Sequence, residues 1–333
     1  MPQQLNQRTS KIFPEFKSAI PWLGADLQTF RNFLIPKPTA LHLNNSQRIF
    51  FQMDDGSGDK LNGIICRPEL PNSKFPLLIL IHGLTGSEQS SYMVGACNYF
   101  AQCGYSVLRL NLRGSAATWG DCRRHYHAGS GEDLDAVLKQ LVQLKQAPNG
   151  FILMGFSLGG NMLLKFLSEY GASHPIRSSV SISAPIDLVR TSERLLQPRN
   201  KFYHHWLLRQ MKRDALALKD ISLKEKKIIL NARNVFQFDD RFVAPLNGFR
   251  GAVDYYKKCS SISFLDGILA PTLIISALDD PWVPSVMYLE KDWGRLLPIK
   301  IILPRHGGHL GFHDKIGCWY NRIAEIFFSK PSL

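Results

Sequence analysis

Short apolar runs alternate with longer stretches of helical periodicity along most of this chain. The stretches Glu132 to Lys145 and Asn161 to Glu169 repeat their apolar residues at the spacing of an amphipathic helix. Apolar strands separated by helices are typical of a parallel sheet buried on both faces, so the pattern predicts an α/β fold. The predicted strands are Phe75 to Ile81, Ser106 to Leu112, Phe151 to Met154, Ser179 to Ser183, Thr272 to Ser276 and Ile301 to Leu303.

The N-terminal part of the chain has a different pattern. Arg48 to Met53 and Leu61 to Cys66 flank the turn-forming sequence DDGSGD, which predicts a β-hairpin. Residues 1–45 are irregular and punctuated by prolines, so we expect an arm packed on the core rather than a separate domain. Residues 46–333 then form one α/β domain with helices flanking a mostly parallel central sheet.

One long interval lacks a core strand. It runs from Pro185 to Pro271 and leaves the predicted sheet at the carboxyl end of a strand. Within it, the segment from Asp187 to Asn234 is rich in basic and bulky apolar residues. Active sites of parallel α/β sheets form at that edge, so residues of about 186–245 are expected to form a helical cap over a site. The alternative is an amphipathic helical linker with no role at the site.

Composition narrows the function classes. The chain has 333 residues, 45% hydrophobic and 20% charged, and a net charge of +13 at neutral pH. No zinc-finger spacing or basic aromatic pattern accompanies the charge, so nucleic acid is not an expected partner. The six cysteines are scattered, which indicates free thiols in a reducing compartment. The polar N-terminus lacks a signal-peptide core and the run Leu77 to Ile81 is too short to span a bilayer, so we expect a cytoplasmic protein.

A serine lies in a sequence that suits a nucleophile. Ser157 stands in Gly-Phe-Ser-Leu-Gly, after the strand FILM and before the helical run NMLLKFL. A nucleophile elbow holds its serine in a strained turn and needs small neighbours, which Gly155 and Gly159 provide. The backbone N–H of Leu158, at the start of the following helix, is the expected first oxyanion donor. The alternative is an ordinary serine in a glycine-rich turn.

The loop after the strand Leu77 to Ile81 should supply the second oxyanion donor. It reads His-Gly-Leu-Thr-Gly, and the backbone N–H of Leu84 is our candidate. His82 precedes Ser157 in the chain. In α/β folds with a nucleophile elbow, the catalytic base follows the nucleophile, in the order Ser, Asp, His. We therefore expect His82 to brace the loop by hydrogen bonds rather than to act as the base.

The acid and the base of a triad have competing candidates. Asp280 is the preferred acid because Pro281 and Pro284 stiffen the turn after it, and Asp279 is then a loop-capping carboxylate. His309 is the preferred base because it follows two glycines on a loop that can reach the serine. The other histidines of the same stretch, His306 second and His313 third, remain as alternatives. A metal site in this histidine cluster is disfavoured because no carboxylate–histidine helix motif accompanies it.

Several runs together resemble the YheT-like branch of the α/β-hydrolase family, and they span about residues 20–330 in the family's order. That branch is similar to yeast medium-chain fatty-acid ethyl ester synthase/esterases and to animal α/β-hydrolase-domain phospholipases. One departure is Asp26, which stands where the family usually has a histidine. The runs are DLQTF, HGLTGS, RRHYHAGSGEDL, GFSLGGN, FDDRFVAP, DYYKKCS, ALDDPWVP and GGHLGF.

The resemblance implies carboxylic ester hydrolysis, often of medium-chain acyl esters, and carries the family's triad over to Ser157, Asp280 and His309. The family's separation of acid and base also fits Asp280 better than Asp279. No metal or organic cofactor is needed for this chemistry. The expected function is a serine esterase acting on short- to medium-chain or lipid esters. An acyltransferase with the same triad and a catalytically silent scaffold are the alternatives.

The predicted cap suggests one further partner. Its basic residues alternate with bulky apolar ones, and a basic amphipathic helix can lie on an anionic membrane surface. The sequence thus predicts an acyl ester substrate, and peripheral membrane contact through the cap is a hypothesis beside it. The favoured interpretation of the pattern is a cap that turns its apolar face to the core and its charges to water.

Overall fold

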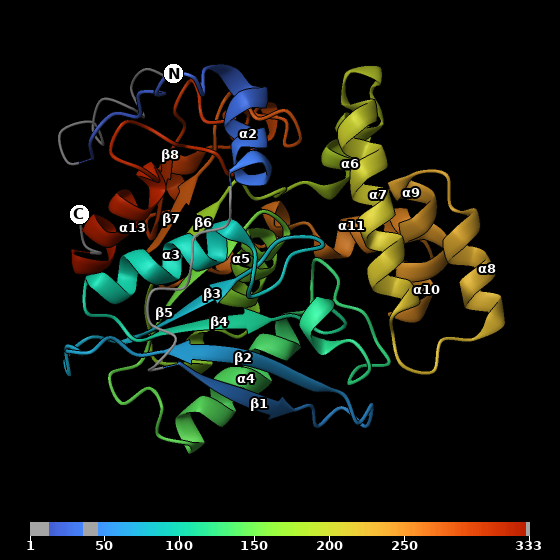
Figure 1. Cartoon of the computed structure of the whole chain (residues 1–333), viewed down its shortest axis with the longest axis horizontal. Coiled ribbons are helices and arrows are strands. Elements are labelled where there is room, and N and C mark those ends of the chain that lie inside the picture. The colour runs from blue at the N-terminus through green and yellow to red at the C-terminus, as the bar shows by residue number, and fades with distance from the viewer. Residues whose placement is uncertain (1–12, 36–45, 331–333) are drawn as a thin grey trace.

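The computed structural model describes residues 13–35 and 46–330, and these form one mixed sheet with helices on both faces (Figure 1). The strand order is β1-β2-β4-β3-β5-β6-β7-β8. β1 pairs with β2 and β2 with β4 in antiparallel fashion, and every other pair is parallel. The predicted α/β-hydrolase fold class is confirmed. The strands are β1 (Ser46–Gln52), β2 (Lys60–Cys66), β3 (Leu77–Ile81), β4 (Val107–Asn111), β5 (Phe151–Phe156), β6 (Ile176–Ile182), β7 (Thr272–Ile275) and β8 (Ile299–Ile302).

The strands lie where the apolar runs predict them, with shifts at the ends. The predicted hairpin is confirmed, with Phe51 opposite Leu61 across the β1–β2 pair. β6 begins at Ile176, before the predicted Ser179. The apolar pattern did not include its first residues because they lie at the rim of the sheet and are polar or half exposed. β3 and β5 are buried along their whole length, as expected for the centre of a sheet that is covered on both faces.

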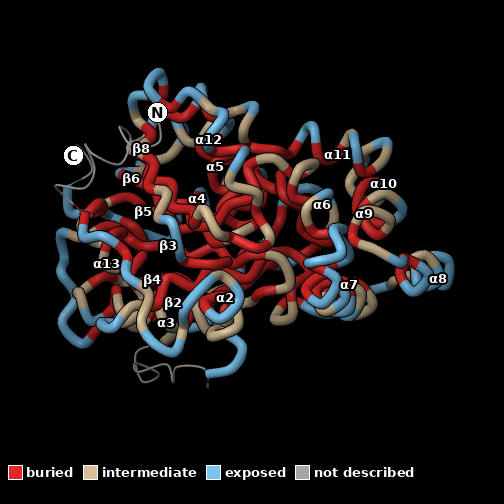
Figure 2. The backbone as a smooth tube through the Cα atoms, turned by 90° about the horizontal axis from the view of Figure 1, so that it is seen from above, coloured by how far each residue is buried: buried red, intermediate tan, exposed pale blue. Residues whose placement is uncertain are grey.

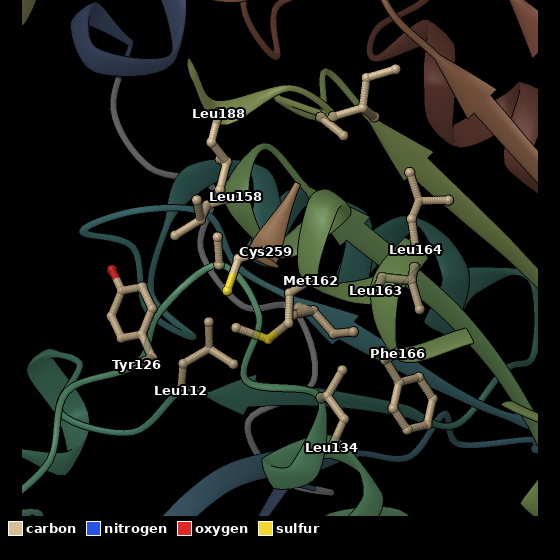
Figure 3. Packing of buried hydrophobic residues seen from close by; sticks show 14 of the residues in the cluster. Leu112, Tyr126, Leu134, Leu158, Met162, Leu163, Leu164, Phe166, Leu188 and Cys259 are labelled. Carbon is tan, nitrogen blue, oxygen red and sulfur yellow. The ribbon is translucent and has the colours of Figure 1, made fainter. Parts of the chain in front are cut away.

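Two helical layers cover the sheet. α4 (Gly131–Gln143) and α5 (Leu158–Glu169) pack on one face in a large apolar cluster. α3 (Ser91–Gln102) and α13 (Trp319–Ser329) pack on the other face in a second cluster. Figure 3 shows part of the first cluster around α5, which leads directly from Ser157 into the core. The sequence pattern predicts α4 and α5, whereas α3 and α13 were not singled out.

Helices fill the interval between β6 and β7 and form a lobe beside the sheet, on the right in Figure 1. The lobe shares the large apolar cluster with α4 and α5, so its core is continuous with that of the sheet. Figure 2 shows α8 at its far end, largely exposed. Its members are α6 (Leu188–Leu196), α7 (Lys201–Leu216), α8 (Leu223–Asn231), α9 (Val235–Phe238), a π-helical turn η5 (Asp239–Val243), α10 (Ala244–Leu246) and α11 (Ala252–Cys259).

Residues 1–45 are the predicted arm. The structure describes residues 13–35 of this arm, and its residues 1–12 and 36–45 lie outside the described residues. The expectation of irregular structure is wrong for α2 (Gly24–Leu34), which packs against the C-terminal part of the chain. Its core-facing residues are polar, so the apolar periodicity that reveals a helix in a sequence is missing on that side. Phe16, before it, packs edge-on against Trp319 of α13.

Short elements complete the described chain. All six cysteines are free thiols, as predicted. Within residues 13–35 and 46–330, no helix combines the length and the apolar character that a bilayer span requires. The short elements are α12 (Val286–Leu289) and the 3₁₀ turns η2 (Ala116–Thr118), η3 (Gly171–Ser173), η4 (Pro198–Asn200), η6 (Ser261–Ser263), η7 (Leu265–Gly267) and η8 (Trp293–Arg295).

Candidate active site

Ser157 lies on the sharp turn between β5 and α5. Its backbone has φ 51° and ψ −121°, a conformation that a non-glycine residue adopts only at a cost. The turn is held because the Ser157 N–H donates to the Ile182 carbonyl of the neighbouring strand, at 2.8 Å. A Cβ atom on Gly159 would lie 2.3 Å from the His82 carbonyl oxygen, so only glycine fits there. The turn predicted around Ser157 is therefore present, and its tightness explains why Gly159 is a glycine.

His309 joins the serine to an aspartate. Its Nε2 lies 3.0 Å from the Ser157 Oγ, and its Nδ1 lies 2.9 Å from Asp280 Oδ2. The second carboxylate oxygen of Asp280 accepts the N–H groups of Trp282, at 2.8 Å, and Val283, at 3.0 Å. With Asp280 and His309 both buried, this chain of hydrogen bonds can orient the imidazole and carry a proton between Oγ and Nε2.

The competing aspartate and histidine form a separate pair at the rim. Asp279 Oδ1 accepts the Gly308 N–H at 3.0 Å, and Asp279 Oδ2 lies 3.2 Å from Nδ1 of the exposed His306. Asp279 thus caps the loop that precedes His309. Within the described chain, neither Asp279 nor His306 is hydrogen bonded to Ser157.

His313, the third candidate, is bound to α2 instead. Its Nε2 lies 3.0 Å from Asn32 Oδ1, and its Nδ1 lies 2.9 Å from Arg31 Nη1. Burial, together with the positive charge of Arg31, lowers the pKa of His313 to about 3. This histidine is a neutral structural group that fastens the loop to the helix.

Two contacts that the sequence did not predict hold His309 in place. Its backbone N–H donates to Thr29 Oγ1 of α2 at 2.8 Å. Its ring stacks on the indole of Trp282, with centroids 4.4 Å apart and planes 21° apart. An indole face favours a neighbouring positive charge, so this stacking suits an imidazole that becomes protonated during a reaction.

The loop after β3 approaches the serine closely. A Cβ atom on Gly83 would lie 2.9 Å from the Ser157 Cβ, so the loop can come this near only with glycine. The N–H of Gly83 donates to the Tyr92 hydroxyl at 3.1 Å, and that of Thr85 donates to the Tyr126 hydroxyl at 2.6 Å. Between them, the Leu84 N–H has no hydrogen-bond acceptor in the described part of the chain. It is therefore free to bind a ligand atom.

His82 braces this loop, as predicted. Its Nε2 accepts the Leu112 N–H at 3.1 Å, and its Nδ1 donates to the Gly83 carbonyl at 2.8 Å. Complete burial lowers the pKa of His82 to about 4, so the ring is neutral at physiological pH and can make both bonds at once. Its edge also packs against the ring of Tyr126.

The start of α5 supplies a second free donor. The Leu158 N–H is the first of the helix and, within residues 13–35 and 46–330, no acceptor within hydrogen-bond distance is found for it. The N–H groups of Gly160 and Asn161, further into the first turn, bond back to the Ser157 carbonyl at 2.8 and 3.1 Å. The positive end of the helix dipole therefore faces the serine, where it favours negative charge.

A cavity of about 350 Å³ opens over the serine and His309. It is bounded by α2, by the loops after β3, β7 and β8, and by the lobe between β6 and β7. Most of its wall is apolar, which suits a hydrocarbon chain. The apolar lining residues from the lobe are Leu188, Leu195, Trp206, Leu207, Met211 and Val235.

One acidic group stands in this apolar wall. Asp239, on the π-helical turn, accepts a hydrogen bond from the Tyr256 hydroxyl at 2.6 Å, and both residues line the cavity. Burial raises the pKa of Asp239 to about 7. A carboxyl with this pKa is partly protonated at neutral pH and can then donate as well as accept a hydrogen bond.

Comparison with known proteins places the chain in a family. Residues 76–316 match the family model described as the alpha/beta hydrolase fold. YheT of Escherichia coli strain K12 is 32% identical to this chain over 245 residues, which cover 71% of this chain and 70% of YheT. The name of YheT provisionally assigns it as an esterase. The chain belongs to the α/β-hydrolase family. This agrees with the resemblance found in the sequence runs.

Other α/β-hydrolase relatives cover more of the chain. Phospholipase ABHD3 of Bos taurus is 26% identical, covering 90% of this chain and 72% of the phospholipase. Among solved structures, the esterase Pf2001 of Pyrococcus furiosus superposes with a TM-score of 0.59 over 88% of this chain and 96% of the esterase, at 18% identity, which shows a shared fold. Ester hydrolysis in the general sense is the activity that this α/β-hydrolase shares with its relatives.

The structure also gives a place to residues without a predicted role. Asp26, the departure from the family pattern, binds Arg199 at 2.9 Å and the Tyr203 hydroxyl at 2.7 Å, and so ties α2 to α7 of the lobe. Thr29, Tyr126, Asp239 and Trp282 all lie in the runs that carry the family resemblance, which was the available signal for them. Among the described residues, no cluster of His, Cys, Asp or Glu side chains has the arrangement of a metal site.

Proposed function

We propose that this α/β-hydrolase cleaves short- to medium-chain or lipid acyl esters through an acyl-enzyme on Ser157, with His309 as base and Asp280 as its orienting acid. The observation that carries the proposal is the unbroken chain of hydrogen bonds from Ser157 Oγ to His309 and on to Asp280, at 3.0 and 2.9 Å. It lies beneath a largely apolar cavity. A serine within reach of a base that is itself oriented by a third group is the arrangement used for nucleophilic catalysis.

The first half of the reaction forms the acyl-enzyme. His309 Nε2 takes the proton of the Ser157 hydroxyl as Oγ attacks the ester carbonyl carbon, and the carbonyl oxygen becomes negative. The free N–H groups of Leu84 and Leu158 bind this oxyanion, and each such donor contributes about 2.7–4 kcal/mol to the transition state. The intermediate then expels the alcohol, which receives the proton from His309.

The second half releases the acid. A water molecule takes the place of the alcohol, gives its proton to His309 and attacks the acyl carbon. Collapse of this second intermediate breaks the bond to Oγ, the proton returns to Ser157, and the carboxylic acid leaves. No metal or organic cofactor takes part in these steps.

The lining of the cavity supports the proposed substrate class. A wall of leucine, methionine, valine and tryptophan side chains favours an acyl chain over a polar group, because burying apolar surface stabilises the complex by roughly 25 cal/mol per Å². The helices between β6 and β7 supply much of this wall. We therefore assign the segment of about 186–245, extended to α11, the role of a cap that selects the acyl group, with residues 46–333 as the hydrolase domain.

Labelling with a fluorophosphonate probe tests the nucleophile. We expect the native chain and Ser157→Ala to differ completely, the variant taking up no probe. Ser73→Ala, in an exposed turn far from the cavity, is the matched control and should label like the native chain. Labelling that persists in Ser157→Ala would show that another residue is the nucleophile.

Turnover of p-nitrophenyl esters tests the substrate class. We expect hexanoate and decanoate to give a higher kcat/KM than acetate, because only the longer acyl chains reach the apolar side chains that line the cavity. Equal values for all three would contradict the assignment of the cavity to the acyl group. Adding ethanol or glycerol and measuring new esters distinguishes transfer to an alcohol from hydrolysis, since both begin from the same acyl-enzyme.

A further inference from the structure

Helix α2 has its polar face turned inward. Gln28 and Thr29 are fully buried, and their side chains bind the backbone of the loop that carries His309. Gln28 donates to the His313 carbonyl at 2.9 Å and accepts the His313 N–H at 2.8 Å. Asn32 donates to the Leu310 carbonyl at 2.8 Å. The inner face of the helix is therefore polar and is joined to this loop by several hydrogen bonds.

The outer face of α2 is apolar and exposed. Leu23, at the start of the helix, Leu27 and Leu34 follow one another at spacings of four and seven residues, which put them on one side of the helix, and Ile20 lies in the turn before it. Ile20 is 82% exposed and Leu34 65% exposed. Surface helices of globular proteins normally turn this stripe to the core, so the inversion indicates a surface that meets something apolar.

The apolar stripe continues onto α7. Phe30 of α2 packs against Phe202 of α7, with ring centroids 5.9 Å apart, and Phe202 is itself 67% exposed. Figures 1 and 2 show α2 and α7 on the same side of the molecule. We call the five exposed residues Ile20, Leu23, Leu27, Leu34 and Phe202 the α2–α7 rim.

Positive charge lies next to the rim. Arg199 in the turn before α7 and Lys201 at its start are exposed beside Phe202, and exposed Arg209 follows Phe202 two helical turns later. The acidic residue of α2, Asp26, is already paired with Arg199 at 2.9 Å. Residues 188–233 hold twelve Lys and Arg against four Asp and Glu, so the part of the chain that contains α7 is strongly basic. An apolar stripe bordered by basic residues is complementary to an anionic bilayer.

The rim also borders the cavity. Phe33 of α2 and Trp206 of α7 both line it, and their rings meet edge-on with centroids 4.8 Å apart. The cavity reaches from this aromatic pair to Ser157 and His309. An acyl chain that leaves a bilayer at the rim would therefore meet this aromatic pair at the edge of a largely apolar cavity.

We propose that the α2–α7 rim docks on the surface of an anionic lipid bilayer, with its apolar side chains among the acyl chains and the basic residues of α7 facing the lipid phosphates. The delivery of a lipid ester from this surface rests on the proposed function. The docking does not, because it uses residues outside the Ser157–His309–Asp280 chain. The chemistry of the rim is that of an interfacial anchor rather than of a membrane span.

Vesicle flotation tests the docking. The protein is the Ser157→Ala chain, so that lipid turnover has no part in the result and a failure of the ester assignment would leave the measurement unaffected. Vesicles of phosphatidylcholine with phosphatidylserine should bind it, vesicles of phosphatidylcholine alone should bind it more weakly, and added salt should weaken the difference.

Leucine variants decide whether the rim is the surface. Replacing Leu23, Leu27 and Leu34 together by serine should lower vesicle binding on the order of a hundredfold, because about half of each side chain is available for transfer into lipid. The matched control replaces Leu70, Leu269 and Leu297 by serine, which are at least as exposed but lie on other parts of the molecule. This control should bind like the parent chain, and thermal unfolding checks that both variants are folded.

Charge variants test the basic border separately. Lys201→Glu with Arg209→Glu should abolish the preference for phosphatidylserine vesicles. Unchanged binding of the leucine variant, or an equal loss in the control, would overturn the proposal. Absence of vesicle binding together with a dimer that the leucine variant dissociates would also overturn it, and would assign the rim to self-association.

Discussion

The hydroxyl of Tyr126 offers a test of how the oxyanion loop is positioned. It accepts the Thr85 N–H at 2.6 Å, and Thr85 itself has a positive φ of 57°. A β-branched residue in this conformation is strained and is held there by its surroundings. Tyr126→Phe removes the acceptor and leaves the ring packing intact. We expect Thr85 to relax and the neighbouring Leu84 N–H to lose its alignment with the oxyanion.

The size of the effect can be bounded. Complete loss of one oxyanion donor costs about 2.7–4 kcal/mol, or a factor of about 10² to 10³ in kcat. A displaced donor retains part of its interaction, so we expect kcat to fall about 10- to 100-fold, which corresponds to roughly 1.4–2.7 kcal/mol. KM should change little, because the hydroxyl binds the loop and does not line the cavity. The free energy of unfolding should fall by about 1–3 kcal/mol, as one buried N–H loses its partner.

Steady-state hydrolysis of p-nitrophenyl hexanoate and chemical unfolding measure the two quantities. Tyr288→Phe is the matched control, because Tyr288 is also buried and its hydroxyl also bonds a backbone group, the Ala184 carbonyl, away from the loop. It should lose comparable stability and keep its kcat. A folded Tyr126→Phe variant whose kcat stays within a factor of about two would refute the assignment of Leu84 as a donor aligned through Thr85.

Three further predictions concern other groups around the cavity. Asp280→Asn should lower kcat on the order of 10⁴-fold, because it disturbs the tautomer of the His309 imidazole, whereas Asp279→Asn should lower kcat less than about tenfold. If the same ester assay gave the reverse order, Asp279 would be the triad acid. Thr29→Val should lower stability by about 1–3 kcal/mol and slow fluorophosphonate labelling, because the His309 N–H is left buried without an acceptor. Burial raises the pKa of Asp239 from 3.8 to about 7, so its contribution to folding is present at acidic pH and is lost as the pH rises through 7. The free energy of unfolding of the Asp239→Asn variant should therefore fall less between pH 4 and pH 8 than that of the native chain, by on the order of 4 kcal/mol. The same pH dependence of unfolding in both chains would contradict this prediction.

The sequence predicts the sheet and the central helices well because those elements are buried uniformly. β3 and β5 are apolar at nearly every position, so a short stretch of sequence is enough to predict each strand, and burial on both faces is typical of strands in a parallel sheet. α4 shows a regular apolar stripe for the same reason. α2 carries its leucines on the exposed side, and its core face is polar because its partner is the backbone of a loop about 280 positions away along the chain. The spacing of apolar residues therefore does not show which face of α2 is buried.

The residues of the candidate site are likewise of two kinds, those that a local motif predicts and those that only the fold brings together. Ser157 and the glycines beside it are fixed by local turn geometry, which a short motif records. The choice between Asp279 and Asp280 depends on which carboxylate turns inward, and adjacent residues in a loop carry no periodicity that would tell them apart. Trp282 stacks on His309 only because the loops after β7 and β8 meet at one edge of the sheet. That meeting is a property of the fold, and no local pattern records it.

The bond between Thr29 and the backbone of His309 has a consequence for biosynthesis. The two residues are 280 positions apart, so at 5–20 residues per second the ribosome needs roughly 15–60 seconds to make the second after the first. During that time the polar side of α2 lacks its permanent partner, and its leucine stripe is open to whatever the emerging chain meets. We therefore expect the nascent protein to depend on holding factors more than a domain of its size whose first helix packs on an early strand.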